Sequence, residues 1–181
     1  MSSYRLRPIV DADLPFLRQV YASTRQTEMA LIDWSEERKA QFLDMQFEAQ
    51  HRHYQQHYAD AEFSVIEVDA QDAGRLYRLD TAGECRIVDI SLLPAFRNRG
   101  IGSAILYRLI EEACARGASV TIHVEKSNPA LSLYRRLGFQ AARDAGVYLL
   151  MERPPAPGGA AVQCEQRPIP AINQRSEEQH E

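Results

Sequence analysis

Two glycines separate a strand-like run from a helix-like run, and this junction constrains the fold more than any other feature of the sequence. The strand-like run covers residues 86–93 and ends at a proline. From Ile101 onward, apolar residues recur at helical spacing until Gly117, which is placed as a carboxyl-terminal stop. A strand that turns directly into a helix indicates a mixed fold, in which helices cover a sheet.

The junction itself, residues 92–103, is suited to holding a pyrophosphate. Gly100 and Gly102 let the backbone approach a ligand closely. The first amides of the following helix are free and lie at the positive end of its dipole, while Arg97 and Arg99 add full charges. The alternative interpretation is an ordinary glycine-rich turn with solvated arginines.

Spacing argues against two common phosphate motifs. A dinucleotide fingerprint, GxGxxG, requires glycine where Ile105 stands, and a P-loop requires a Gly-Lys-Ser/Thr sequence that the chain lacks. Neither NAD nor ATP is therefore the expected ligand.

The rest of the sequence alternates between strand and helix periods, which predicts one α+β domain. The expected strands span residues 4–9, 62–68, 74–79, 86–93, 118–124 and 147–152, with one more candidate before Gly146. Helices are expected after Asp11 as a cap, after Ser35 as a cap, after the phosphate turn, and over residues 128–137. The three strands between residues 62 and 93 are expected to form an antiparallel meander.

Length and charge narrow the class of protein. The chain has 181 residues, which suits one domain with a proper core, and we expect a domain over 1–153 and a disordered, proline-rich tail over 154–181. A net charge of -4 argues against a nucleic-acid partner. No secretory signal or bilayer-spanning run is evident, so we expect a cytoplasmic protein with no membrane partner. Three cysteines without a CxxC pair are expected to be reduced: Cys85, Cys114 and Cys164.

Two stretches resemble the GCN5-related N-acetyltransferase (GNAT) superfamily. Residues 97–102, Arg-Asn-Arg-Gly-Ile-Gly, match the family's Arg/Gln-x-x-Gly-x-Gly/Ala signature, whose turn binds the pyrophosphate of acetyl-coenzyme A. A second group of residues looks like the family's other motif: Glu125, Asn128-Pro129-Ala130, Leu133-Tyr134 and Leu137-Gly138-Phe139. The resemblance extends over residues 4–152, is weak before Glu84 and is absent from the tail.

The resemblance implies a GNAT-like mixed, mostly antiparallel central sheet of six to seven strands. About four helices would flank it, and its fourth and fifth strands would splay apart to hold the pantetheine arm of acetyl-CoA. A backbone N–H near Leu92 would act as the oxyanion donor. The coenzyme-binding residues implied are Ile90, Ser91, Leu92, Leu93, Arg97, Asn98, Arg99, Gly100, Ile101, Gly102, Ser103, Asn128 and Tyr134.

The catalytic groups follow from the chemistry of an amine acceptor. An alkyl ammonium is almost entirely protonated at pH 7, so transfer requires a base or a chain of waters. Asp89 interrupts an apolar strand and, by simple alternation, shares a face with Ile87 and Ser91, which makes it the first candidate base. A buried structural carboxylate is the equal alternative. The resemblance implies that Tyr134 protonates the leaving thiolate, and a core tyrosine is the alternative.

Several other side chains are weaker candidates for a role in catalysis, acceptor binding or metal binding. Glu28, in an expected loop between helices, and Glu84 or Glu125, at strand ends, are alternatives for the base that could instead bind the charge of the substrate. Glu28, Asp33 and Glu125 are candidate contacts for a cationic acceptor. Trp34 is a candidate for the acceptor pocket or the core. His53 and His57 lie one helical turn apart without an evident third ligand, so no metal is expected. His123 is interpreted as structural or as a supporting residue.

Together these patterns predict an acetyl-CoA-dependent N-acetyltransferase. The acceptor would be a small-molecule or peptide amine that attacks directly in a ternary complex. The alternative is a non-catalytic acyl-CoA sensor that kept the binding turn, and an interaction module delivered by the tail is a third reading. The sequence leaves open which amine is used and whether two copies form a homodimer.

Overall fold

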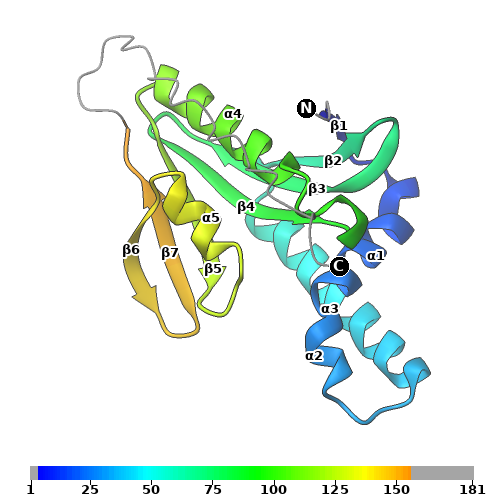
Figure 1. Ribbon diagram of the computed structural model, residues 1–181. Helices are drawn as coiled ribbons and strands as arrows, with labels where there is room; N and C mark the ends of the chain where they lie inside the picture. Colours follow the sequence, from blue (N-terminus) through cyan, green and yellow to red (C-terminus); the bar gives the residue numbers. More distant parts are fainter. Residues whose placement is uncertain (1–3, 156–181) are drawn as a thin grey trace, which may run out of the picture.

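Seven strands form one mixed sheet in the order β1-β2-β3-β4-β5-β7-β6 (Figure 1). The computed structural model describes residues 4–155, so residues 156–181, nearly all of the expected tail, lie outside the described part. The strands are β1 (Tyr4–Pro8), β2 (Glu62–Val68), β3 (Gln71–Asp80), β4 (Glu84–Leu92), β5 (Ser119–Glu125), β6 (Gln140–Ala145) and β7 (Tyr148–Arg153). The helices are α1 (Leu14–Thr24), α2 (Gln26–Ala30), α3 (Glu36–His57), α4 (Ile101–Ala115) and α5 (Leu131–Arg136), with short 3-10 turns η1 (Asp11–Asp13) and η2 (Pro94–Phe96).

Strands β4 and β5 are parallel neighbours that pair only at their beginnings. The pairing runs from Glu84 with Ser119 to Ile87 with Ile122, whereas β4 continues to Leu92. Every other neighbouring pair is antiparallel, including the expected meander of β2, β3 and β4. The predicted separation of the fourth and fifth strands is confirmed, and we call this opening the β4–β5 fork.

Helices cover both faces of the sheet, with α4 on one face and α1 and α3 on the other (Figure 1). On the α4 face, Ile105 and Leu109 of α4 belong to one buried cluster with Ile87 and Ile122 of the sheet. Each such side chain contributes roughly 1.5–3 kcal/mol by leaving water. On the opposite face, which we call the α3 face, α1 and α3 pack together through a second, smaller cluster: Leu17, Tyr21 and Phe47.

One extra residue in β4 changes which side chains share a face. Asp89 pairs with Tyr77, but the next residue of β3, Arg78, pairs with Ile87, so Val88 is an inserted bulge. Because paired residues lie on the same side of a sheet, the bulge places Ile87 on the α4 face and Asp89 on the α3 face. The expectation that Ile87 and Asp89 share a face is therefore wrong, since simple alternation does not count the inserted residue.

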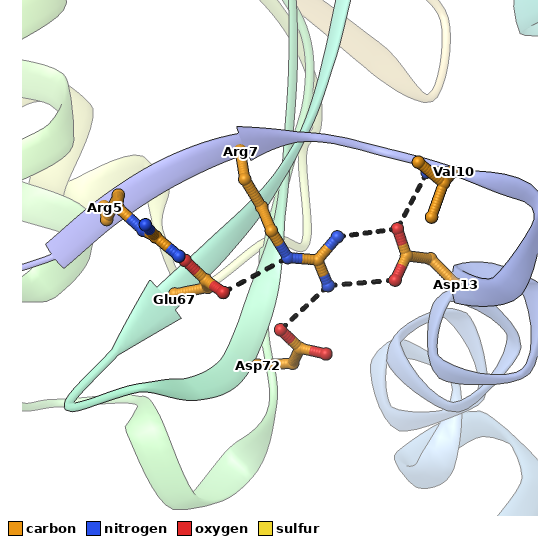
Figure 2. A network of polar contacts seen from close by, with 6 residues as sticks. All are labelled: Arg5, Arg7, Val10, Asp13, Glu67 and Asp72. Atoms are coloured by element: carbon orange, nitrogen blue, oxygen red, sulfur yellow. Dashed lines mark hydrogen bonds and ion pairs between the residues drawn. The ribbon is translucent and has the colours of Figure 1, made fainter.

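An ionic network joins η1 to β1 and to neighbouring strands of the sheet (Figure 2). Arg7 donates to both carboxylate oxygens of Asp13, at 2.7 and 2.9 Å, and to Asp72 at 3.0 Å. Asp13 also accepts a hydrogen bond from the Val10 amide at 2.8 Å. Asp11 lies inside η1, so its predicted role as a helix cap is wrong, because a 3-10 turn precedes α1.

Other element boundaries show where local patterns succeed and fail. Ser35 caps α3 as predicted, accepting a hydrogen bond from the Arg38 amide at 3.3 Å. Glu28 lies in the short helix α2 rather than in a loop. The helix predicted from residue 128 begins later, because Asn128 accepts from the Ala130 amide at 2.8 Å and forms a turn instead.

Two further properties concern the described residues only. Within residues 4–155, no helix is both long and apolar enough to cross a membrane. Cys85, which is buried, and Cys114, which is half-buried, carry free thiols, while Cys164 lies outside the described range.

Candidate active site

The turn before α4 leaves backbone amides at the start of the helix without a helical partner. Gly100 has φ of +79°, a left-handed conformation that favours glycine, and Asn98 also has positive φ, at +58°. The Ala104 amide bonds to the Gly100 carbonyl at 3.0 Å, which begins the helical ladder. The three preceding amides, over residues 101–103, therefore have no partner within the helix. A side chain at Gly100 would meet no protein atom within 4 Å, so the space beside the turn is open.

The two arginines of the turn have different surroundings. Arg97 donates to the Leu92 carbonyl at 2.8 Å and to the carbonyl and hydroxyl of Ser23, each at 3.1 Å. Its guanidinium thus ties the end of β4 to α1. Arg99 is 42% exposed and lies 3.8 Å from the Asp69 carboxylate, a loose contact that leaves its charge accessible beside the turn. Arg99 is therefore the better placed of the two to meet a phosphate.

Backbone groups of β4 point into the β4–β5 fork at alternate residues. The Leu93 amide bonds to the Ala73 carbonyl of β3 at 2.8 Å. In an antiparallel pair every second residue bonds to its neighbour, so Ser91 also bonds toward β3, and Ile90 and Leu92 point the other way. The Leu92 carbonyl is taken by Arg97. Of the residues predicted to line the coenzyme arm, Ile90 and Leu92 thus present their amides to the fork.

Tyr134 of α5 approaches the fork from the α4 face. The residue is only 4% exposed, and its ring packs edge-on against Phe139 with centroids 5.7 Å apart. Burial, reinforced by the negative charge of Asp89, raises the pKa of the Tyr134 phenol well above its ordinary value. The hydroxyl therefore stays protonated at neutral pH and is available as a hydrogen-bond donor.

Asp89 lies in a buried polar network on the α3 face. Its two carboxylate oxygens accept hydrogen bonds from Arg75, at 3.2 and 2.8 Å. Further bonds come from the Ser91 hydroxyl at 2.9 Å and the Tyr54 hydroxyl at 3.2 Å. Arg75 also donates to Gln50 of α3 at 2.7 Å. With its lone pairs engaged by four donors, Asp89 matches the structural alternative better than the role of base.

Two of the predicted acceptor contacts converge on one arginine. Arg25, at the end of α1, donates to Glu28 at 2.9 Å and to Glu125 at 3.4 Å. Tyr148 of β7 reaches Glu125 at 3.5 Å. The cluster joins α1 and α2 to the outer end of β5, at the mouth of the fork. Asp33 is exposed beyond α2 and is not part of this cluster.

Arg25, Arg75 and Tyr54 were not identified from the sequence. Arg75 alternates with apolar neighbours in β3, a pattern typical of a solvent-facing arginine, yet it is 2% exposed. Its partner Asp89 is the signal that could have located it, because a charge within an apolar strand requires an opposite charge nearby.

The remaining candidates lie in α3, before it, or at the start of β4. The His53 and His57 rings stack with centroids 4.2 Å apart, and His57 Nδ1 lies 3.0 Å from the His53 carbonyl. Within residues 4–155, no group of three metal-ligating side chains forms. Trp34 packs edge-on against Phe42 and beneath Arg38. Glu84 is bonded to Arg86 and Thr121 at the closed end of the sheet.

Comparison with known proteins identifies the kind of domain. The family model described as Acetyltransferase (GNAT) family matches residues 28–139, more than half of the chain. Mouse and human cysteine-rich protein 2-binding proteins are 43% identical over 47 residues, which is 26% of this chain but only 6% of each relative.

Two solved structures illustrate the fold. The PaiA N-acetyltransferase of Thermoplasma acidophilum, in complex with coenzyme A, is 20% identical with a TM-score of 0.63, covering 84% of this chain and 99% of that one. The ribosomal-protein-S18-alanine N-acetyltransferase of Escherichia coli is 21% identical with a TM-score of 0.54, covering 88% and 99%. At these identities the likeness shows the fold alone.

Proposed function

Because the chain belongs to the acetyltransferase (GNAT) family, we propose that it transfers an acetyl group from acetyl-CoA to an amine, which attacks directly in a ternary complex. The observation that carries this proposal is the β4–β5 fork, which opens next to the free amides at the start of α4. A ligand with a diphosphate at one end and an extended arm at the other suits that combination.

The donor is placed by backbone groups. The amides of residues 101–103 and the Arg99 side chain would hold the pyrophosphate, while the pantetheine arm follows β4 toward the closed end of the fork. The amides of Ile90 and Leu92 would pair with the arm, and Asn128 is a further contact at the outer end of β5. Arg97 supports this site indirectly, by fixing the end of β4.

The chemistry requires an oxyanion donor and a proton donor. Attack of the amine on the thioester carbonyl places negative charge on its oxygen, which a fixed backbone amide stabilises. Ile90 is nearer than Leu92 to the closed end, where the thiol end of the arm would lie. As the C–S bond breaks, Tyr134 would give the leaving thiolate its proton.

The acceptor enters from the α3 face. Glu28 and Glu125 lie at that mouth and, together with Asp33 nearby in the chain, are the proposed contacts for a cationic acceptor. Arg25 already bridges the first two carboxylates. An acceptor that binds there would compete with Arg25 for these carboxylates, which supports a small-molecule or peptide amine as the acceptor.

Two measurements test the proposal. Calorimetric titration with coenzyme A should show binding at one site. Release of free thiol from acetyl-CoA should then accelerate with at least one amine of a panel comprising spermidine, benzylamine, p-toluidine and a peptide with a free amino terminus. Binding without amine-dependent thiol release would favour the non-catalytic acyl-CoA sensor, and absence of binding would refute both functions.

A further inference from the structure

His123 is the first residue of β5 beyond the last pair with β4. That pair joins Ile87 to Ile122, so His123 stands where the two strands begin to diverge. Its neighbours Ile122 and Val124 are buried in the core on the α4 face, whereas His123 is exposed. By the alternation of a strand, its side chain lies on the α3 face at the closed end of the fork.

The bulge at Val88 brings Asp89 to this same face. Arg86 of β4 pairs with Thr121 of β5 across the closed end, and both lie on the α3 face. On the same face, the next polar residue along β4 is Asp89, and the next residue along β5 is His123. Tyr134 approaches the same opening from the other face, near enough for the Asp89 charge to affect its pKa. The closed end of the fork is thus bordered by three groups able to exchange protons, each from a different element.

Of these three groups, His123 is the one whose basic lone pair, on a ring nitrogen, is not engaged by a described hydrogen bond. Asp89 accepts bonds from Arg75, Tyr54 and Ser91, and Tyr134 stays protonated. Within the described residues, the histidine rings that take part in hydrogen bonds are those of His51 and His57.

Partial burial and the neighbouring positive charges keep the His123 ring neutral. Besides Asp89 and its partner Arg75, the charged strand residues on its face include Glu84 and Arg86 of β4, Glu125 of β5, Arg143 of β6 and Glu152 of β7. Partial burial lowers the pKa of His123, and the Arg86 and Arg143 charges lower it further, outweighing Glu84. At neutral pH the imidazole therefore carries a free lone pair.

We propose that His123 is the catalytic base, which takes a proton from the acceptor ammonium at the closed end of the fork. This inference rests on the proposed acetyl transfer. The neutral amine then forms the C–N bond at the thioester carbonyl and the C–S bond breaks. The nitrogen loses a second proton as the thiolate gains one through Tyr134, and His123 later releases its own proton to water. The balance is one amide, one thiol and one proton released.

The decisive experiment compares two isomeric acceptors with the His123→Gln variant. Benzylamine is an ammonium at neutral pH and needs a base, whereas p-toluidine is already neutral. With benzylamine, the single-turnover rate of the variant should fall by roughly 10²-fold or more. With p-toluidine it should hardly change. Because the ring is exposed, the melting temperature and the affinity for coenzyme A should match the parent.

Two further variants complete the test. His57→Gln, at the end of α3, should leave both rates at the parental value. His123→Glu, which restores a base, should recover part of the benzylamine rate. An equal loss with both amines, or no loss with either, would overturn the role of His123. A parent protein inactive toward every amine would refute the proposed function itself.

Discussion

The two sides of the β4–β5 fork are built from different chemical groups. The proposed coenzyme side relies mainly on main-chain amides and a left-handed turn within residues 90–103, with the Arg99 side chain beside them. The proposed acceptor side consists of side chains from β3, β4, β5, α1, α2 and α3, such as the network around Asp89. One side is thus specified by backbone conformation over a short stretch, and the other by long-range packing.

The largest effect is expected from Gly100→Val. A β-branched residue is strongly disfavoured at φ of +79°, and its side chain would enter the open space beside the free amides. We expect calorimetric binding of coenzyme A to be abolished while the domain stays folded. Gly83→Val is the matched control, because Gly83 has ordinary φ and equally open surroundings. Parental affinity in the Gly100 variant would remove the turn from the coenzyme site.

On the acceptor side, Arg75→Met should damage stability rather than coenzyme affinity. The change leaves the buried Asp89 carboxylate without its ionic partner, which costs about 3–5 kcal/mol of unfolding free energy. Urea unfolding measures the loss. Arg108→Met removes an arginine paired with Glu112 on the exposed side of α4 and should cost at most about 1 kcal/mol. Equal losses would show that the network around Asp89 is not structural.

Tyr134→Phe tests a group that borders both sides. Only the hydroxyl is lost, so the packing against Phe139 and the affinity for acetyl-CoA should be retained. If the phenol donates the proton, single-turnover rates fall by roughly 10²-fold. If the tyrosine is only a core residue, stability changes by ~1 kcal/mol and the rate hardly at all. Tyr107→Phe, at an exposed position of α4, serves as the control.

The smallest effect concerns the attachment of α1, which carries part of the acceptor side. Hydrogen bonds from Arg7, supported by the Val10 amide, hold the pKa of Asp13 below its ordinary value. This contribution is present above the unfolded pKa of about 3.9 and is lost as pH falls through the lower folded pKa. Asp13→Asn should therefore cost about 1–2 kcal/mol at pH 7 and less at pH 3.

Unfolding at the two pH values, with Asp11→Asn as the control, checks this expectation. Asp11 lies inside η1 and carries no cap, so its variant should match the parent at both pH values. A constant difference between parent and Asp13→Asn from pH 7 to pH 3 would contradict the ionic origin of the effect.

The sequence predicted the backbone elements around the proposed coenzyme side well, because their determinants are local. Gly100 indicates a turn, the apolar repeat from Ile101 predicts α4, and Ser35 predicts the start of α3. Sheet order and the β4–β5 fork came from the family resemblance rather than from periodicity. These features depend on neighbours in the chain or on a motif that is itself contiguous.

The proposed acceptor side is harder to predict from the sequence, because its contacts join residues that are distant in the chain. The bulge at Val88 leaves no trace in an apolar run, yet it decides which face Asp89 occupies. The burial of Arg75 depends on partners 14 and 25 residues away, Asp89 and Gln50. The sequence alone indicates only a structural or supporting role for His123, because its position at the end of strand pairing is visible only once β4 and β5 lie side by side.

The bulge at Val88 shifts the alternation of β4 by one residue. Beyond it, each side chain lies on the opposite face of the sheet, and each amide at the opposite edge of the strand, from the one that simple alternation assigns. A one-residue deletion in β4 could preserve an apolar, hydrogen-bonded strand and still exchange the polar and apolar faces beside the fork. Insertions and deletions at this point would therefore be selected against far more strongly than substitutions of Val88 itself.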